Sequence, residues 1–146
     1  MVEVFCSDLS PAAVRLTGEN ALKSGVASRV HAIECDLGNG LDGLFDVVVS
    51  NPPYVPTELL VDLPGEVSSY EPRLALDGGA DGLDVFRRIV DWASSSLREG
   101  GLLACELHED AMRSASAIAE GAGYSDVRVV KDLVGKDRVL LAVWKG

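Results

Sequence analysis

The tetrapeptide Asn51-Pro52-Pro53-Tyr54 combines residue types that can receive a planar group carrying an NH2 nitrogen. Asn51 offers a side-chain carbonyl, and the prolines lack N–H donors and have fixed φ angles, which leaves their carbonyls in a stiff arc. Tyr54 adds a flat face for stacking. An amide nitrogen is a poor nucleophile because its lone pair is delocalised. Hydrogen bonds from its N–H groups to the Asn51 side-chain oxygen and the Pro52 carbonyl would direct that lone pair at an electrophile such as a methyl sulfonium.

The position of this tetrapeptide favours a function over a simple turn. Asn-Pro and Pro-Pro are common in loops, so the composition alone is compatible with a turn. However, the tetrapeptide directly follows the valine-rich stretch 45–50, which reads as a buried parallel strand. Ligands of open α/β sheets bind at the carboxyl ends of the strands. We therefore predict that the tetrapeptide is part of a binding or catalytic site.

Two aspartates are predicted to lie at the ends of other strands. Asp8 comes two residues after a strand expected at 2–6, and Asp36 ends a strand expected at 29–35. A carboxylate in that position can hold the two hydroxyls of a nucleoside ribose. Either aspartate alone could be a helix cap or a turn residue. The pair is more informative, because each ends its own strand and is followed by a leucine, Leu9 or Leu37.

The periodicity of the chain predicts an α/β fold that positions these residues. The expected strands lie at residues 2–6, 29–35, 45–50, 102–107, 125–132 and 138–144, and the expected helices at 11–24, 82–98 and 109–120. Ser10 is the predicted cap of the first helix and Gly25 its terminator. The loop between the last two strands is too short for a parallel crossover. We predict a single domain over 1–146 with a mostly parallel sheet and one antiparallel strand.

Composition and charge narrow the classes of partner. The chain has 23 acidic and 13 basic residues, a net charge of −10, and no basic cluster, which disfavours nucleic acid and favours proteins or small molecules. No apolar run approaches the ~20 residues that cross a bilayer, and no leader sequence is visible, so a cytoplasmic protein without membrane contact is expected. Cys6, Cys35 and Cys105 are predicted to be reduced core thiols rather than metal ligands.

Four stretches carry a resemblance to a known family. They read "DVVVSNPPYVP", "YEPRLALDGGADGLDVFRRIV", "LREGGLLACELH" and "GYSDVRVVKDLVGKDRVLLAVWKG". Together they closely resemble the catalytic domain of the release factor glutamine methyltransferases, the HemK/PrmC family. The tetrapeptide is shared with adenine-N6 methyltransferases, whereas the second stretch points to the glutamine enzymes. The resemblance implies a Rossmann-like class I fold and transfer of a methyl group from S-adenosyl-L-methionine to the glutamine of the Gly-Gly-Gln motif in peptide-chain release factors.

The resemblance also implies roles for individual residues. Asp8 with Leu9 would hold the ribose of the cofactor, and Asp36 with Leu37 would border its adenine. The acceptor glutamine would be received by the tetrapeptide: Asn51, Pro52, Pro53 and Tyr54. Asn51 would also contact the cofactor. Independently of the resemblance, the loop "EPR" (71–73) follows the tetrapeptide, and we predict that it closes over the substrate through Glu71.

The chain departs from this family at its start. Family members have a glycine-rich loop after the first strand of the sheet, whereas this chain begins at what corresponds to the second strand. We therefore expect an N-terminally truncated catalytic domain that is weak or inactive when isolated. "DGGADG" (77–82) follows no strand and is predicted to serve a loop. Without the first strand, the strands ending at Cys6 and Ser50 should have open edges, which makes a dimer possible.

Two alternative functions remain open from the sequence. One is an adenine-N6 nucleic-acid methyltransferase that uses the same tetrapeptide, and it predicts a basic face. The other is a degenerate methyltransferase-like domain that binds a protein without catalysis, and it predicts no measurable cofactor binding even when a complementary N-terminal segment is supplied.

Overall fold

The computed structural model of the chain describes residues 2–62 and 72–146. They divide into two compact units, Met1–Asp42 and Gly43–Gly146, and each unit has its own sheet. The single domain expected over 1–146 stays a prediction.

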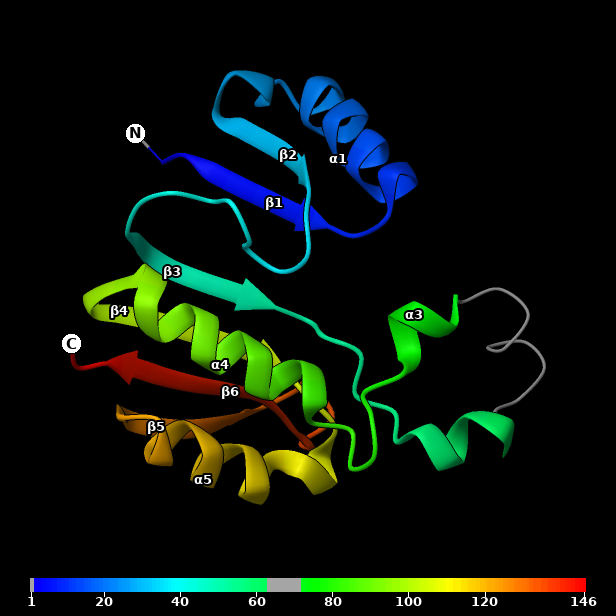
Figure 1. The fold of residues 1–146 in the computed structure, drawn as a ribbon, viewed down its shortest axis with the longest axis vertical. Helices are drawn as coiled ribbons and strands as arrows, with labels where there is room; N and C mark the ends of the chain where they lie inside the picture. Colours follow the sequence, from blue (N-terminus) through cyan, green and yellow to red (C-terminus); the bar gives the residue numbers. More distant parts are fainter. Residues whose placement is uncertain (1, 63–71) are drawn as a thin grey trace. The chain divides into compact units, whose positions relative to one another are not determined.

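The first unit is a parallel strand pair covered by one helix (Figure 1). Strand β1 (Val4–Asp8) pairs with β2 (Val30–Glu34), and α1 (Pro11–Lys23) packs on both, with the short helix η1 (Ala27–Arg29) before β2. The Ser10 hydroxyl accepts a hydrogen bond from the Ala13 N–H at 3.3 Å, which confirms the predicted cap. Gly25 adopts a φ of 70° just after the helix, as a terminating glycine does.

The strand boundaries of this unit differ from those expected. Strand β1 continues to Asp8, so Asp8 is its last residue rather than a residue beyond it, and β2 ends at Glu34, two residues before Asp36. Strand β1 extends to Asp8 because the hydrogen bonds between strands are made by backbone groups and do not require apolar side chains. Asp8 is in register with Glu34, and the Cys35 N–H donates to the Asp8 carbonyl at 3.1 Å. The expected strand 2–6 is therefore shifted by two residues relative to β1, whereas the expected strand 29–35 exceeds β2 by one residue at each end.

The second unit is a four-stranded sheet in the order β3-β4-β6-β5. Its strands are β3 (Phe45–Ser50), β4 (Leu97–Glu106), β5 (Tyr124–Lys131) and β6 (Asp137–Trp144), and its helices are α4 (Asp84–Ser96) and α5 (Met112–Gly121) with the short helices η2 (Thr57–Asp62), α3 (Arg73–Leu76) and η3 (Glu109–Ala111). Strand β3 runs parallel to β4, and β6 runs antiparallel to both β4 and β5. The expected single antiparallel strand is therefore β6, and the α/β class is confirmed.

The core of this unit lies between one face of the sheet and its helices. Helix α4 packs on β4, α5 packs on β5 and β6, and α4 and α5 contact each other (Figure 1). Residues alternate between buried and half-buried along β4 and β6, so one face is closed off from water. The buried members of that face are Leu103, Cys105, Leu107, Leu140 and Ala142, opposed by Phe86, Ile89, Val90 and Ala93 of α4. The Tyr124 hydroxyl donates to the Val90 carbonyl at 3.1 Å and so joins sheet and helix.

Strand β3 corrects one expectation. Its valines were predicted to be buried, yet the exposed fractions of Val47 and Val49 are 51% and 76%. Val47 and Val49 are in register with Leu102 and Ala104 of β4, so they lie on the face of the sheet opposite to the buried Leu103 and Cys105. In addition, β3 is an edge strand, bonded only to β4 within its sheet. Strand β1 likewise has β2 as its one partner. Over residues 2–62 and 72–146, each of the two strands therefore has one unpaired edge, as expected.

The cysteines differ in their surroundings. All three thiols are free, but only Cys105 is buried, and Cys6 and Cys35 are half-buried. Burial raises the pKa of the Cys105 thiol to about 12, so it behaves as a small apolar side chain. The Cys35 thiol donates to the Leu37 carbonyl at 3.3 Å. The prediction of core thiols is therefore right for Cys105 and wrong for the other two.

Residues 2–62 and 72–146 contain neither a membrane-spanning helix nor a metal-binding cluster. In that part of the chain no helix has the length and apolarity to span a membrane, and no three His, Cys, Asp or Glu side chains gather as a metal site would require.

Candidate functional site

The first group of candidate residues lies at one end of the β1-β2 pair. Because the two strands are parallel and in register, Asp8 and Asp36 follow the same carboxyl edge of this small sheet. Asp8 is exposed, and its Oδ1 accepts the Ser10 N–H at 2.8 Å. Asp36 is half-buried, and its carbonyl accepts the Asn39 N–H at 3.1 Å. The structure thus brings the two predicted aspartates to one edge.

The leucines beside these aspartates differ from each other. Leu9 is 47% exposed. Leu37 has a φ of 54°, in the left-handed region, which costs an L-residue roughly 1–2 kcal/mol. Hydrogen bonds lie on both sides of it: the Cys35 thiol donates to the Leu37 carbonyl, and the Asn39 N–H donates to the Asp36 carbonyl. Backbone outliers of this kind gather at ligand sites, so Leu37 supports the assignment of this edge to a ligand.

The second group of candidate residues follows β3 directly. Asn51 to Tyr54 adopt neither helix nor strand, so their backbone is shaped by the prolines and by packing. Pro52 is buried, Pro53 and Tyr54 are half-buried, and Asn51 is exposed. The buried proline therefore anchors a short segment whose flanking side chains, an amide and a phenol ring, remain accessible.

One face of Tyr54 has an aromatic neighbour. The ring centroids of Tyr54 and His108 are 6.3 Å apart with an angle of 43° between the rings. His108 precedes η3 as its cap, and its Nδ1 accepts the Asp110 N–H at 3.3 Å. His108 thus caps η3, and its contact with Tyr54 places the ring beside the tetrapeptide.

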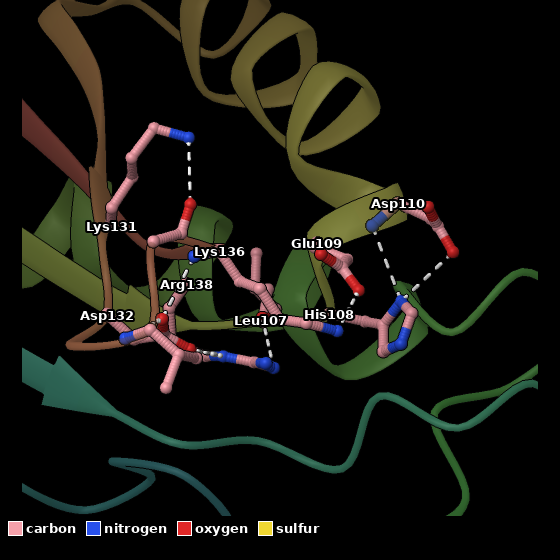
Figure 2. A network of polar contacts seen from close by, with 10 residues as sticks. Leu107, His108, Glu109, Asp110, Lys131, Asp132, Lys136 and Arg138 are labelled. Atoms are coloured by element: carbon pink, nitrogen blue, oxygen red, sulfur yellow. Dashed lines mark hydrogen bonds and ion pairs between the residues drawn. The ribbon is translucent and has the colours of Figure 1, made fainter.

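A polar network braces the segment that carries His108 (Figure 2). Glu109 bonds to Lys136 Nζ at 2.7 Å, and this hydrogen bond holds the pKa of the Glu109 carboxyl below its usual value. Asp132 Oδ1 accepts the N–H groups of Val134 and Lys136 at 3.0 and 2.9 Å and so fixes the β5-β6 turn. The turn is thereby tied to η3, which stabilises the position of His108.

The glycine-rich loop 77–82 lies against the residues that follow the tetrapeptide. The Val55 N–H donates to the Leu76 carbonyl at 2.9 Å, and the Gly78 N–H donates back to the Val55 carbonyl at 2.8 Å. The Thr57 N–H donates to the Gly79 carbonyl at 2.9 Å. These bonds form a short parallel bridge between Val55 and Asp77, so segments more than 20 residues apart in sequence run side by side.

Asp77 links three parts of this region. Its Oδ1 accepts the Thr57 hydroxyl at 2.6 Å and the Gly79 N–H at 3.1 Å, and its Oδ2 accepts Arg73 Nε at 3.4 Å. The Thr57 hydrogen bond, with a smaller effect from Gly79, lowers the pKa of the Asp77 carboxyl from 3.8. Because the folded pKa lies below the unfolded value, the ionised carboxyl stabilises this region above that unfolded value and loses the effect as the pH falls through the folded pKa.

The sequence identified only part of this arrangement. It found both aspartates and the tetrapeptide, and it described loop 77–82 only as a loop. It missed the contact of that loop with Tyr54, although the paired glycines of "DGGADG" were a signal of close backbone approach. The prediction for Glu71 falls outside the described residues.

Comparison with known proteins gives close relatives in sequence. The chain is 46% identical over 141 residues to a release factor glutamine methyltransferase of Moorella thermoacetica, covering 95% of this chain and 50% of the relative. The same name applies to a relative in Caulobacter vibrioides, 43% identical over 137 residues, with 93% and 47% covered. The chain thus spans about half the length of the curated relatives it matches. No protein-family model matches the chain.

A solved structure gives the fold. A methyltransferase from Pyrococcus furiosus superimposes with a TM-score of 0.68 at 22% identity, over 99% of this chain and 63% of that one. At this identity the likeness concerns the architecture alone, and it supports the Rossmann-like methyltransferase fold.

Proposed function

This chain is a relative of the release factor glutamine methyltransferases, and we propose that it forms part of an enzyme that transfers a methyl group to the side-chain nitrogen of a glutamine. The family resemblance found in the sequence motifs is confirmed by the 46% identity across 95% of the chain. That identity is the observation that carries the proposal. The acceptor is the glutamine of a Gly-Gly-Gln motif in a peptide-chain release factor.

The methyl donor in this proposal is S-adenosyl-L-methionine, whose sulfonium supplies an electrophilic methyl group. The edge of the β1-β2 pair fits its nucleoside, because an exposed carboxylate at Asp8 can accept the ribose hydroxyls. Leu9 is exposed beside Asp8, and the left-handed Leu37 follows Asp36. We assign Asp8 and Leu9 to the ribose, Asp36 and Leu37 to the adenine, and a further contact to Asn51.

The tetrapeptide receives the glutamine amide in this proposal. The Asn51 side-chain oxygen and the Pro52 carbonyl accept the two N–H groups, and Tyr54 stacks on the amide plane. These acceptors stabilise the positive charge that develops on nitrogen as it forms a bond to the methyl carbon. The carbon–sulfur bond breaks with its electron pair on sulfur, and one N–H proton then leaves the nitrogen. This proton is acidic at that stage, so no strong base is needed.

The charge of the chain supports a protein acceptor over nucleic acid. The net charge of −10 repels phosphates, and binding to DNA or RNA requires a cationic footprint. We also propose that the protein acts in the cytoplasm, with the release factor as its partner. A dimer through the open edge of β3 remains part of the proposal, since unpaired strand edges associate readily.

The test combines cofactor binding with methyl transfer. Titration calorimetry of S-adenosylmethionine into this chain, together with a complementary N-terminal segment that supplies the glycine-rich strand, should give one-to-one binding. Incubation of the same assembly with a release factor should add one methyl group to the Gly-Gly-Gln glutamine by mass spectrometry. The matched control is the same release factor with that glutamine changed to glutamate. Methylation of the control at equal rate would contradict the proposed acceptor.

The same measurements separate the two alternatives. Methyl transfer to an adenine in duplex DNA, with none to the release factor, would establish the nucleic-acid methyltransferase. Absence of cofactor binding even with the complementary N-terminal segment, together with retained binding of the release factor, would establish a non-catalytic protein-binding domain.

A further inference from the structure

The loop 77–82 approaches Tyr54 more closely than any side chain would allow. A methyl group added to Gly78 would lie 2.7 Å from the Tyr54 Cα and 2.8 Å from the Gly82 Cα. One added to Gly82 would overlap the Tyr54 carbonyl oxygen. Carbon atoms in contact are normally about 3.5–4.0 Å apart, so both glycines are required for the backbone of Tyr54 to lie where it does.

The far side of this loop is held by α4. The Asp84 N–H donates to the Gly78 carbonyl at 2.9 Å, and Leu83, beside Gly82, is 1% exposed. Arg87 of α4 bonds to the two oxygens of Asp81 at 2.9 and 2.6 Å. The loop therefore cannot retreat from an added methyl group without disturbing the helix, and Tyr54 is the side that must move.

The near side is tied to the segment after the tetrapeptide. The bonds that join Val55 to Leu76 and Gly78, and Thr57 to Asp77 and Gly79, keep the two segments in fixed register. A displaced loop or a displaced Tyr54 would have to break them. The contact is thus a backbone clamp, which we define as Asp77, Gly78 and Gly82 against Tyr54, Val55 and Thr57.

We propose that Gly78 and Gly82 are positioning residues that hold the backbone of Tyr54, and through it the flat face of the ring, where the acceptor amide stacks. The stacking of the amide rests on the proposed function, whereas the effect on Tyr54 does not. Neither glycine touches the substrate. Each acts by leaving room that a Cβ would fill.

The chain contains a matched control for each glycine. Gly121 shares an ordinary φ with Gly78 but has open space around it, so Gly121→Ala controls for Gly78→Ala. Gly100 has a φ of 78°, close to the 77° of Gly82, and also faces open space, so Gly100→Ala controls for Gly82→Ala. Within each pair, only Gly78 or Gly82 lies close to Tyr54, whereas both substitutions carry the backbone cost of replacing a glycine.

The first readout is independent of activity. The protein has 3 tyrosines, so incorporation of 3-fluorotyrosine gives a simple fluorine NMR spectrum, in which Tyr54→Phe identifies the Tyr54 signal. Gly78→Ala and Gly82→Ala should shift or broaden this signal and leave that of the buried Tyr124 unchanged. Gly121→Ala and Gly100→Ala should change neither signal.

The second readout is methyl transfer to the release factor. A displacement of roughly 1 Å at a substrate-positioning group can lower the rate by up to about 100-fold, so we expect kcat/KM for the acceptor to fall about 10- to 100-fold in Gly78→Ala and Gly82→Ala. The Kd for S-adenosylmethionine should stay within about twofold. Gly121→Ala and Gly100→Ala should retain the wild-type rate.

The outcomes separate the two proposals. A Tyr54 signal in Gly78→Ala and Gly82→Ala that matches the controls would overturn the clamp, whatever the activity. A shifted signal with unaltered methyl transfer would overturn its role in positioning the acceptor. A wild-type protein that fails to methylate the release factor would overturn the proposed function, and a shifted Tyr54 signal would then still establish the clamp.

Discussion

Substitution of Asn51 by alanine is expected to lower the rate of glutamine methylation about 100- to 1000-fold, the loss typical when one oriented group that stabilises developing charge is removed. Under the proposed function, the Asn51 side-chain oxygen accepts an N–H of the acceptor amide and so directs its lone pair. Alanine has no acceptor. The Pro52 carbonyl remains, but a single hydrogen bond no longer fixes the rotation of the amide.

The measurement for Asn51 is single-turnover methyl transfer with saturating S-adenosylmethionine. Asn51 is exposed, so its truncation should change the free energy of unfolding by less than about 0.5 kcal/mol. Asn20→Ala, at an exposed position of α1, is the matched control and should keep the wild-type rate. A loss smaller than about threefold in Asn51→Ala would be incompatible with the charge-stabilising role of this side chain.

Substitution of Leu103 by alanine is expected to have the largest effect on stability, about 2–5 kcal/mol in the free energy of unfolding. Leu103 is fully buried on the closed face of the sheet, and β4, which carries it, pairs with both β3 and β6. The loss combines the transfer of the missing carbons to water with the cavity left behind. Its central position limits how far the neighbours can relax into that cavity.

The measurement for Leu103 is urea unfolding followed by tryptophan fluorescence. Both tryptophans, Trp92 and Trp144, belong to the same unit as Leu103, so the signal reports on the relevant core. Leu133→Ala is the control, because Leu133 is fully exposed at the β5-β6 turn and its truncation should cost less than about 0.5 kcal/mol. Equal destabilisation by the two substitutions would contradict the location of the core.

Local signals in the sequence predicted the limits of the first helix better than those of the strands. Ser10 and Gly25 fixed the limits of α1 to within a residue, because a cap and a terminating glycine act on the backbone nearby. Strand β1 continues past its apolar stretch to Asp8, since hydrogen bonding to β2 depends on the partner strand and not on its own side chains. The valines of β3 likewise could not reveal that their strand lies at an edge.

The sequence predicted those candidate-site residues whose side chains carry polar or aromatic groups with a recognisable chemical use. Asn51 and Tyr54 carry groups with evident uses, and Asp8 and Asp36 stand at strand ends. Gly78 and Gly82 contribute only the absence of a side chain, and which atoms fill that space depends on a contact with Tyr54 from 24 or more residues away in sequence. Such a contact becomes visible only in three dimensions.

The buried apolar residues are unevenly shared between the two units, and this has a thermodynamic consequence. Among the described residues that form the core, Ala21 alone belongs to Met1–Asp42, and the others all lie in the second unit. Local opening of the first unit should therefore cost much less free energy than global unfolding, with faster amide exchange in β1 and β2 than in β4 and β6. A ligand held by Asp8 and Asp36 binds only those molecules in which the first unit is folded. Its apparent association constant is therefore the intrinsic constant multiplied by the folded fraction of this unit. Slower exchange in β1 and β2 upon addition of S-adenosylmethionine would measure this coupling directly, and unchanged exchange at saturation would exclude it.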